Sequence, residues 1–275
     1  RNWNVEVGAS VGHYANKVTK LPDGDYTSSV YGDNNILTSV GNPVGLFYGY
    51  KTAGVFATDA EAKAAGKDGY LYMEDNAGLR NDFKAGDVHF IDQNNDGKIS
   101  ELDKVVIGDP NPDIYGNIFA TINYKNLTLT MGWNYSLGND VYNYQRSILN
   151  SGSTFYNQQV AEVAHWRYEG QQTDLPRLAY GDPMGNNRFS DRWIEDGSYL
   201  RLKTLNLSYK VPVPGSWTWL QGLTVWAQAN NLLTFTKYLG SDPEFSIGNG
   251  VLYQGIDCGN IAQGRSFQCG VKINL

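Results

Sequence analysis

Apolar and polar residues alternate with a period of two in several separate segments of the chain. The closing stretch, SFQCGVKINL, places Phe267, Val271 and Ile273 on one face and Ser266 and Gln268 on the other. The same alternation runs through NWNVEVGASV, GLTVWAQANNLL and SYLRLKTLNLSYKV. A period of two matches a β-strand whose two faces meet different surroundings. The pattern therefore predicts an all-β chain built from long strands.

A hairpin is predicted in NIFATINYKNLTLTMGWNY, with its turn at Lys125 and Asn126. In the stretch that begins at Tyr199, the alternation changes parity near Lys203, which indicates a β-bulge. Taken together, the alternating segments predict six antiparallel strands. Their ranges are 2–18, 114–125, 127–140, 193–210, 222–236 and 264–275.

The composition of the two faces distinguishes a membrane sheet from a soluble sandwich. The polar face carries mainly Thr, Asn, Ser and Gly rather than charged residues. The apolar face carries aromatic residues near the strand ends, as in the two interfacial girdles of membrane barrels. An ordinary β-sandwich with scattered aromatic residues remains the alternative. The aromatic residues at strand ends are Trp3, Tyr14, Tyr124, Tyr135, Tyr209, Trp217 and Trp219.

Short and long connections alternate between the predicted strands. Those at 125–126 and 212–222 are short, whereas those at 19–113, 141–192 and 237–263 are long. Membrane barrels have short periplasmic turns and long extracellular loops. We therefore expect the three long connections outside the cell and the C-terminus in the periplasm. The smallest bacterial barrels have about eight strands, and open sheet edges are not tolerated in lipid, so the chain is expected to be part of a larger barrel.

Composition and charge argue against two classes of protein. The formal net charge of −6 at pH 7 disfavours a nucleic-acid partner, which would need a basic surface. No apolar run reaches the roughly 18 residues of a membrane-spanning helix. The chain opens with Arg1 and shows no signal peptide or lipidation motif, so we expect a mature product or a fragment. Cys258 and Cys269 form no CxxC motif, and both a disulfide and two free thiols remain open.

The stretch IDQNNDGKISELD has the spacing of an EF-hand calcium loop. Side-chain oxygens recur at alternate positions, Gly97 allows the sharp turn, and an acidic residue closes the loop. The flanks are too rich in Gly, Pro and β-branched residues for the two helices of an EF-hand sensor. The alternative is an Asx-rich turn whose carboxylates accept backbone N–H groups without a metal. The predicted calcium ligands are Asp92, Asn94, Asp96, the carbonyl of Lys98, Ser100 and Asp103.

No motif in the chain predicts a catalytic residue. GASVG matches the G-x-S-x-G pattern, but Ser10 lies inside an alternating strand rather than at a strand-to-helix turn. The three histidines form no metal-ligand pair. The carboxylate pairs Glu195–Asp196 and Asp242/Glu244 are expected to be solvated groups in loops.

Residues 156–171 have a helical pattern, with Val160, Val163 and Ala164 on one face. We expect a short helix here, within the second long connection. Aromatic residues in and near this segment either stack on a sugar or peptide ligand or pack within the loop, and loop packing is favoured. These residues are Tyr142, Tyr144, Trp166 and Tyr168.

Several stretches together resemble the C-terminal part of the SusC/RagA-type TonB-linked (TonB-dependent) outer-membrane transporters. The matching motifs include WNVEVGASVGHYANKVTKL, VGLFYGYKTAGVF, GDVHFIDQNNDGKISELDKVVIGDPNPDIYGN and GNDVYN. DRWIEDGSYLRLKTLNLSYKVP, NNLLTFTKYLGSDPE and the closing strand follow in the same order. Each motif alone is weak, but their combination across residues 1–275 is specific to that family.

The resemblance implies a transmembrane β-barrel of about 22 strands around an N-terminal plug. The plug and the segment that contacts the TonB complex would lie on sequence outside this chain. The whole protein would import a nutrient oligomer, a glycan or an oligopeptide, across the bacterial outer membrane without catalysing a reaction. A SusD-like surface lipoprotein would cover the extracellular loops, and membrane lipid would surround the barrel. The alternative from another class is a secreted, calcium-stabilised β-rich binding module, which should express without detergent.

Overall fold

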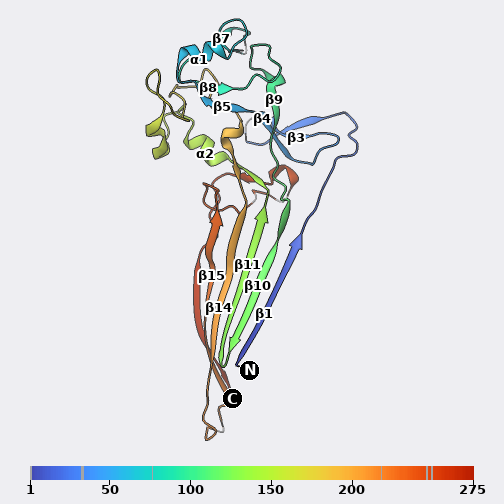
Figure 1. Cartoon of the computed structure of the whole chain (residues 1–275), viewed down its shortest axis with the longest axis vertical. Coiled ribbons are helices and arrows are strands. Elements are labelled where there is room, and N and C mark those ends of the chain that lie inside the picture. The colour runs from blue at the N-terminus through green and yellow to red at the C-terminus, as the bar shows by residue number, and fades with distance from the viewer. Residues whose placement is uncertain (1, 32–33, 76, 218, 246, 249) are drawn as a thin grey trace.

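A computed structural model describes residues 2–31, 34–75, 77–217, 219–245, 247–248 and 250–275. Long antiparallel strands run together along most of its length, and shorter elements gather at one end (Figure 1). Both termini lie at the other end of the long strands. The architecture is mostly β-strand with few helices, as the alternation predicts. None of the helices in the described residues is long and apolar enough to cross a membrane.

A six-stranded antiparallel sheet, which we call the large sheet, contains one strand for each of the six predicted ranges, although the first strand ends at Gly12 rather than at residue 18 and the fourth begins at Tyr199 rather than at residue 193. Its order, β1-β10-β11-β14-β15-β17, follows the chain, so each predicted strand pairs with the next. The hairpin turn lies at Lys125, whose φ of 51° is the left-handed conformation of a tight turn. The strands are β1 (Trp3–Gly12), β10 (Ile114–Tyr124), β11 (Leu127–Leu137), β14 (Tyr199–Val211), β15 (Gly222–Thr236) and β17 (Ser266–Asn274).

Pairing across the large sheet places the apolar positions of its strands on one face. Val5 pairs with Ile122, Ile122 with Leu129, and Leu129 with Leu207. Leu207 pairs in turn with Ala227 on β15. Residues directly opposite in an antiparallel sheet point to the same face. One face of the large sheet is therefore apolar from edge to edge, and we call the other its polar face.

The predicted bulge lies at Lys203. The register of β14 shifts between Leu202 and Thr204 against both of its neighbouring strands. An extra residue in one strand reverses the faces of the positions that follow it. As a result Leu202 and Leu205 both stay on the apolar face, although they lie three positions apart and would otherwise point to opposite faces.

Aromatic rings on the polar face lie over glycines of the neighbouring strands. Phe119 covers Gly8, and Trp226 covers Gly270. A Cβ atom at either glycine would collide with the ring beside it. The close approach of ring and backbone explains why these strand positions are glycine.

The three long connections fold together at one end of the large sheet, and we call this assembly the end unit. The backbone N–H of Tyr50 donates to the carbonyl of Phe189 (3.2 Å), which joins the first connection to the second. β12 pairs with both β13 and β16, which joins the second to the third. The strands of the end unit are β2 (Tyr26–Ser29), β3 (Asn34–Thr38), β4 (Leu46–Tyr50), β5 (Thr52–Val55), β6 (Tyr72–Glu74), β7 (Arg80–Asp82), β8 (Val88–Phe90), β9 (Lys104–Gly108), β12 (Asp140–Asn143), β13 (Ile194–Asp196) and β16 (Ile256–Asp257).

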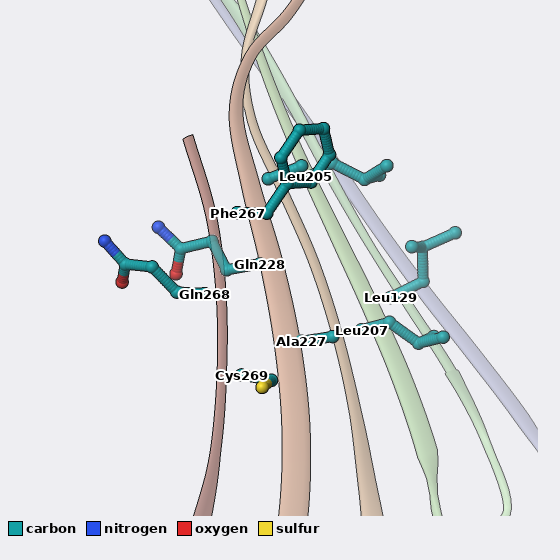
Figure 2. A pocket seen from close by; sticks show the side chains of 9 residues that line it. Leu129, Leu205, Leu207, Ala227, Gln228, Phe267, Gln268 and Cys269 are labelled. Carbon is teal, nitrogen blue, oxygen red and sulfur yellow. The ribbon is translucent and has the colours of Figure 1, made fainter. Parts of the chain in front are cut away.

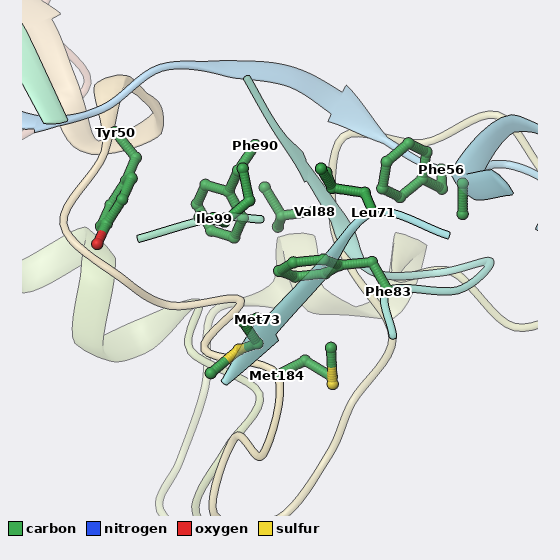
Figure 3. Packing of buried hydrophobic residues seen from close by; sticks show 10 residues of the cluster. Tyr50, Phe56, Leu71, Met73, Phe83, Val88, Phe90, Ile99 and Met184 are labelled. Atoms are coloured by element: carbon green, nitrogen blue, oxygen red, sulfur yellow. The ribbon is translucent and has the colours of Figure 1, made fainter. Parts of the chain in front are cut away.

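Two buried apolar clusters hold the end unit together. The first surrounds Phe83 and Phe90 and draws in Met184 from the second connection (Figure 3). The second cluster runs from Phe47 in the first connection to Ile256 in the third. Full burial of side chains of this size contributes roughly 1.5–3 kcal/mol each. The long connections therefore form a folded body with its own cores.

The expectation of a helix over residues 156–171 is wrong. This segment contains a single 3-10 turn, η2 (Val160–Ala164). Just beyond it, the backbone N–H of Trp166 donates to the carbonyl of Leu175 (3.0 Å). The N–H of Gly170 likewise bonds outside the segment. Hydrogen bonds to distant backbone thus replace the helical pattern.

Two short α-helices occur elsewhere in the described residues, α1 (Asp59–Ala64) and α2 (Tyr144–Leu149). α1 begins with Thr58, whose hydroxyl accepts from the backbone N–H of Glu61 (3.2 Å). A Thr followed three residues later by Glu is a helix-start signal that was available in the sequence. The other 3-10 turns are η1 (Glu101–Asp103), η3 (Asp191–Trp193) and η4 (Val251–Tyr253).

Replacing Phe83 by alanine should destabilise the end unit by about 3–5 kcal/mol, because this ring is fully buried and its loss leaves a cavity. Protease resistance of the end unit in the intact protein measures the effect. Phe155→Ala is the matched control, since Phe155 is 90% exposed. Equal losses in the two variants would contradict the packing shown in Figure 3.

Candidate functional site

The predicted calcium loop lies on the end unit, and its acidic side chains bond to the loop's own backbone. The carboxylate of Asp92 accepts from the backbone N–H groups of Asp96 (3.3 Å) and Gly97 (2.6 Å). Asp96 accepts from the N–H of Lys98 (2.8 Å). Gly97 has a φ of 86°, a left-handed conformation that glycine adopts readily. The loop therefore makes the sharp turn that its spacing predicts.

Asp103 and Ile99 anchor this loop to the body of the end unit. The fully buried carboxylate of Asp103 accepts from the backbone N–H groups of Gln93 (2.9 Å) and Ser100 (2.7 Å). Ile99 is buried in the first apolar cluster, and its N–H donates to the carbonyl of Tyr72 (2.8 Å). Both ends of the loop are thus held in place.

The chemistry open to this loop is coordination of a hard cation by oxygen. A carboxylate oxygen that accepts one N–H keeps a second lone pair for an ion. Lys98 can offer only its backbone carbonyl as a ligand, because its ammonium group is a cation without a lone pair; that group pairs with Glu74 (2.5 Å). Within the described residues, no three His, Cys, Asp or Glu side chains meet as a metal cluster. Calcium binding therefore stays a prediction, for Asp92, Asn94, Asp96, Lys98, Ser100 and Asp103.

Two hollows meet at Tyr199, where the polar face of the large sheet reaches the end unit. One, of about 400 Å³, is lined by Tyr115 and Tyr199, and the other, of about 440 Å³, by Tyr199 and Phe245. The one charged side chain in their described lining is Glu244. Rings beside uncharged hydrogen-bonding groups suit neutral polar ligands. The amide and hydroxyl groups come from Asn117, Asn134, Ser136, Asn139, Gln254 and Gln263.

An ion-pair network ties the third long connection to β14. Arg201 contacts Asp242 through both terminal nitrogens and pairs with Glu244 (3.0 Å), which also pairs with Lys203 (2.8 Å). Asp242 is 5% exposed and accepts from the backbone N–H of Gln263 (2.9 Å). Burial by itself raises the pKa of Asp242, but the hydrogen bonds from Arg201 and the backbone outweigh burial and hold that pKa below its ordinary value.

The expectation that the carboxylate pairs are solvated is wrong for Asp242 and for Glu195. Glu195 pairs with Arg146 (2.6 Å) and accepts from the backbone N–H of Leu239 (2.9 Å). A buried carboxylate needs such partners, because an uncompensated buried charge is costly. Asp196 is exposed, as expected. Through these ion pairs and hydrogen bonds, Asp242 and Glu195 join segments that are distant in the sequence.

A shallow hollow of about 420 Å³ lies on the apolar face of the large sheet. Figure 2 shows Leu207 and Phe267 on one side of the strands and Gln228 and Gln268 on the other. Leu207 is partly and Phe267 largely exposed to the surroundings of the sheet. The side chains of neighbouring positions therefore point in opposite directions, as a period of two requires.

The remaining candidates from the sequence occupy structural positions. Ser10 lies within β1, as the strand interpretation predicts. Tyr142 is buried in the second apolar cluster, and Trp166 packs over a glycine backbone, so these two rings are loop-packing residues. Cys258 and Cys269 are both free thiols, which decides between the two alternatives for the cysteines.

Comparison with known proteins gives several relatives, although no protein-family profile matches the chain. TonB-dependent receptor P3 of Formosa agariphila is 33% identical over 274 residues, covering 94% of this chain and 26% of the receptor. TonB-dependent receptor SusC of Bacteroides thetaiotaomicron is 26% identical, covering 68% of this chain and 17% of the receptor. The RagAB peptide importer in its closed-closed state aligns with a TM-score of 0.71 and 23% identity, over 99% of this chain and 27% of that chain. The chain spans about a quarter of the length of P3 and of the RagAB chain, and its fold is that of part of the transporter barrel.

Replacing Asp92 and Asp96 together by alanine should abolish calcium binding by the intact protein, because two of the loop's carboxylates are lost. Titration calorimetry measures the binding. Removing calcium from the unmodified protein should also speed protease cleavage within 92–103. The double variant Asp23→Ala plus Asp68→Ala is the control, since it removes the same charge from exposed positions. A rate of protease cleavage that stays the same when calcium is removed would contradict the prediction.

The attachment of the third connection should persist from pH 7 down to about pH 4 and weaken at lower pH. An unfolded Asp titrates near about 3.9, and Asp242 has a lower pKa than this when folded. The stabilisation that the Asp242 carboxylate contributes to the attachment is therefore complete above about pH 4, and it is lost as pH falls through the pKa of Asp242 in the folded protein. Proteolysis at 237–263 across this pH range measures the attachment.

Asp242→Asn should weaken the same attachment by about 3–5 kcal/mol at pH 7, where Arg201 loses its buried charge partner, and should remove the loss of attachment that the unmodified protein shows at low pH. Asp23→Asn, at an exposed position, should leave cleavage unchanged. A pH profile that does not differ between the unmodified protein and Asp242→Asn would overturn the assignment.

Proposed function

The chain is homologous to part of the SusC- and RagA-type TonB-dependent receptors, and from this premise we propose that it forms a section of a transporter barrel in the bacterial outer membrane. The whole protein would import a nutrient oligomer, either a glycan or an oligopeptide, with energy delivered through TonB. A SusD-like surface lipoprotein would cover the end unit. This chain would bind and guide the cargo and would catalyse no reaction.

The continuous apolar face of the large sheet is the observation that supports this proposal best. Val7, Val11 and Phe267 are among its largely exposed side chains. An exposed apolar surface this wide marks a site for lipid or for another protein. On the opposite face, Thr, Asn, Ser and Gln side chains suit a water-filled lumen.

The separation of the aromatic residues at the two sheet ends fits a membrane. On the apolar face, Trp3 and Tyr124 lie together at one end, with ring centroids 4.3 Å apart, and Tyr135, which pairs with Gly116, lies at the other. The eight steps from Tyr124 to Gly116 on β10 span roughly 26 Å at about 3.3 Å per residue. A strand tilt of about 40° reduces this to about 20 Å, against an apolar band of about 25 Å in membrane barrels.

The edges and the polar face of the large sheet complete the proposal. β1 and β17 form its two edges, and their unpaired backbone groups require partner strands in lipid. Strands from the rest of the protein would supply that pairing. The polar face would then line the lumen, with the two hollows at Tyr199 at its outer mouth, in the path of the cargo. Calcium bound within 92–103 would stiffen the end unit outside the cell.

A secreted, calcium-stabilised binding module is the second candidate. The folded end unit with its calcium-like loop favours it, whereas the exposed apolar face does not. The two candidates differ in solubility, because a secreted module stays in solution without detergent and a barrel section requires detergent or a bilayer. Recovery of the intact protein from the soluble fraction would favour the module.

Leu207→Arg should destabilise insertion into bilayers by about 1–2 kcal/mol, because arginine on the lipid face is costly, although less so between the interface and mid-depth than at mid-depth itself. Asn206→Arg is the matched control, since the neighbouring side chain points to the polar face. Urea unfolding of the intact protein in vesicles measures both variants. A loss of the same size in Asn206→Arg, or none in Leu207→Arg, would contradict the assignment of the faces.

A further inference from the structure

A polar hollow of about 430 Å³ lies in the end unit beside the predicted calcium loop. Its walls come from the end of β4 at Tyr50, the start of β9, residues 98–101 and Arg188. Charges of both signs line it, so the partner of each charge decides what the hollow can bind. The cations are Lys98, Lys104 and Arg188, and the carboxylates are Glu74, Asp75 and Glu101.

Arg188 has hydrogen-bonding capacity to spare. Its guanidinium carries five N–H donors, yet the one side-chain acceptor it meets among the described residues is the sulfur of Met73 (3.0 Å), which accepts weakly. No carboxylate of the described residues lies within 4.0 Å of it. The rings of Tyr50 and Phe90 lie 5.6 and 5.9 Å from the guanidinium carbon. Ring contacts therefore hold the guanidinium in place while most of its donors stay unused.

The two lysines are paired, but with partners that can be displaced. Lys104 is 8% exposed and pairs with Glu101 (2.8 Å), whose side chain is 77% exposed. Lys98 pairs with Glu74, which is also exposed. Pairs between exposed groups contribute only about 0–1 kcal/mol, which applies to the partly exposed Lys98 and Glu74. Beside Lys104, an incoming anion can take the place of Glu101, which also accepts from the hydroxyl of Tyr50 (3.2 Å), because the anion keeps the buried ammonium paired while the exposed Glu101 returns to water.

We propose that this hollow binds the carboxylate group of a small acidic ligand, such as a uronate sugar or the carboxylate of a peptide. The planar carboxylate would accept a bidentate pair of hydrogen bonds from Arg188, the geometry that guanidinium favours. Lys104, whose ammonium lies 5.5 Å from the centroid of the Tyr50 ring, would supply a second positive charge. The three carboxylates already in the wall disfavour dianions such as phosphate, so the ligand is a monoanion. The hollow belongs to the end unit and exists whether or not the large sheet spans a membrane.

Chemical protection tests the site in the unmodified protein. Phenylglyoxal modifies free arginine side chains, and mass spectrometry of peptides follows each arginine separately. Glucuronate and N-acetylglycine are the monocarboxylate probes, and glucose is the neutral control. Either probe should slow modification of Arg188, while Arg265, which is exposed, should react at an unchanged rate. Failure of both carboxylates to protect Arg188 selectively would overturn the proposal.

Variants test the role of the guanidinium. Arg188→Gln should raise the Kd for the protecting carboxylate by about tenfold or more, because charge-assisted hydrogen bonds are lost. Arg188→Lys should give an intermediate value, since it keeps the charge but not the fork. Arg265→Gln should change nothing. Protease resistance of the end unit shows whether each variant is folded, and unchanged binding in folded Arg188→Gln would refute the assignment.

The two probes also separate the sources of the carboxylate. Protection by glucuronate alone supports an acidic sugar, and protection by N-acetylglycine alone supports a peptide carboxylate. Protection by both supports a site that recognises the carboxylate itself. Destabilised insertion of the Leu207→Arg variant into bilayers would leave these measurements unaffected, because they depend on the end unit alone.

Discussion

A sheet in lipid meets two conditions at once: every backbone N–H and C=O pairs with a neighbouring strand, and side chains toward the tails are apolar. The inner strands of the large sheet meet both conditions through one register, in which Val5, Ile122 and Leu129 align with Leu207. A slip of one residue would turn a row of Thr and Asn to the apolar side. The tight turn at Lys125 and the bulge in β14 preserve that register locally.

The end unit depends on the same sheet, because Arg201 anchors it from the polar face of β14. The guanidinium and its carboxylates neutralise one another, which makes their burial tolerable. Through Asp242 the third connection is fixed to the sheet, and the pairing of β12 with β16 passes that placement to the second connection. The hollows at Tyr199 take their shape from this series of contacts.

The predicted calcium loop and the hollow at Arg188 lie side by side within the end unit. Lys98 and Ser100 belong to the predicted calcium loop and also line the hollow at Arg188. Any ordering of this loop therefore orders one wall of the hollow. Ile99, between them, is buried in the first apolar cluster, so the same core supports both features.

Local chemistry was enough to determine the six strands, the hairpin, the bulge and the spacing of the calcium-like loop, because alternation and turn residues act over a few positions. Contacts between distant residues decided the rest. Hydrogen bonding to Leu175 kept the segment around Trp166 from being helical. Asp242 is buried because it meets Arg201, 41 positions away. A lone arginine such as Arg188 carries no pattern, and its chemistry arises only where the fold surrounds it with rings and leaves its donors free.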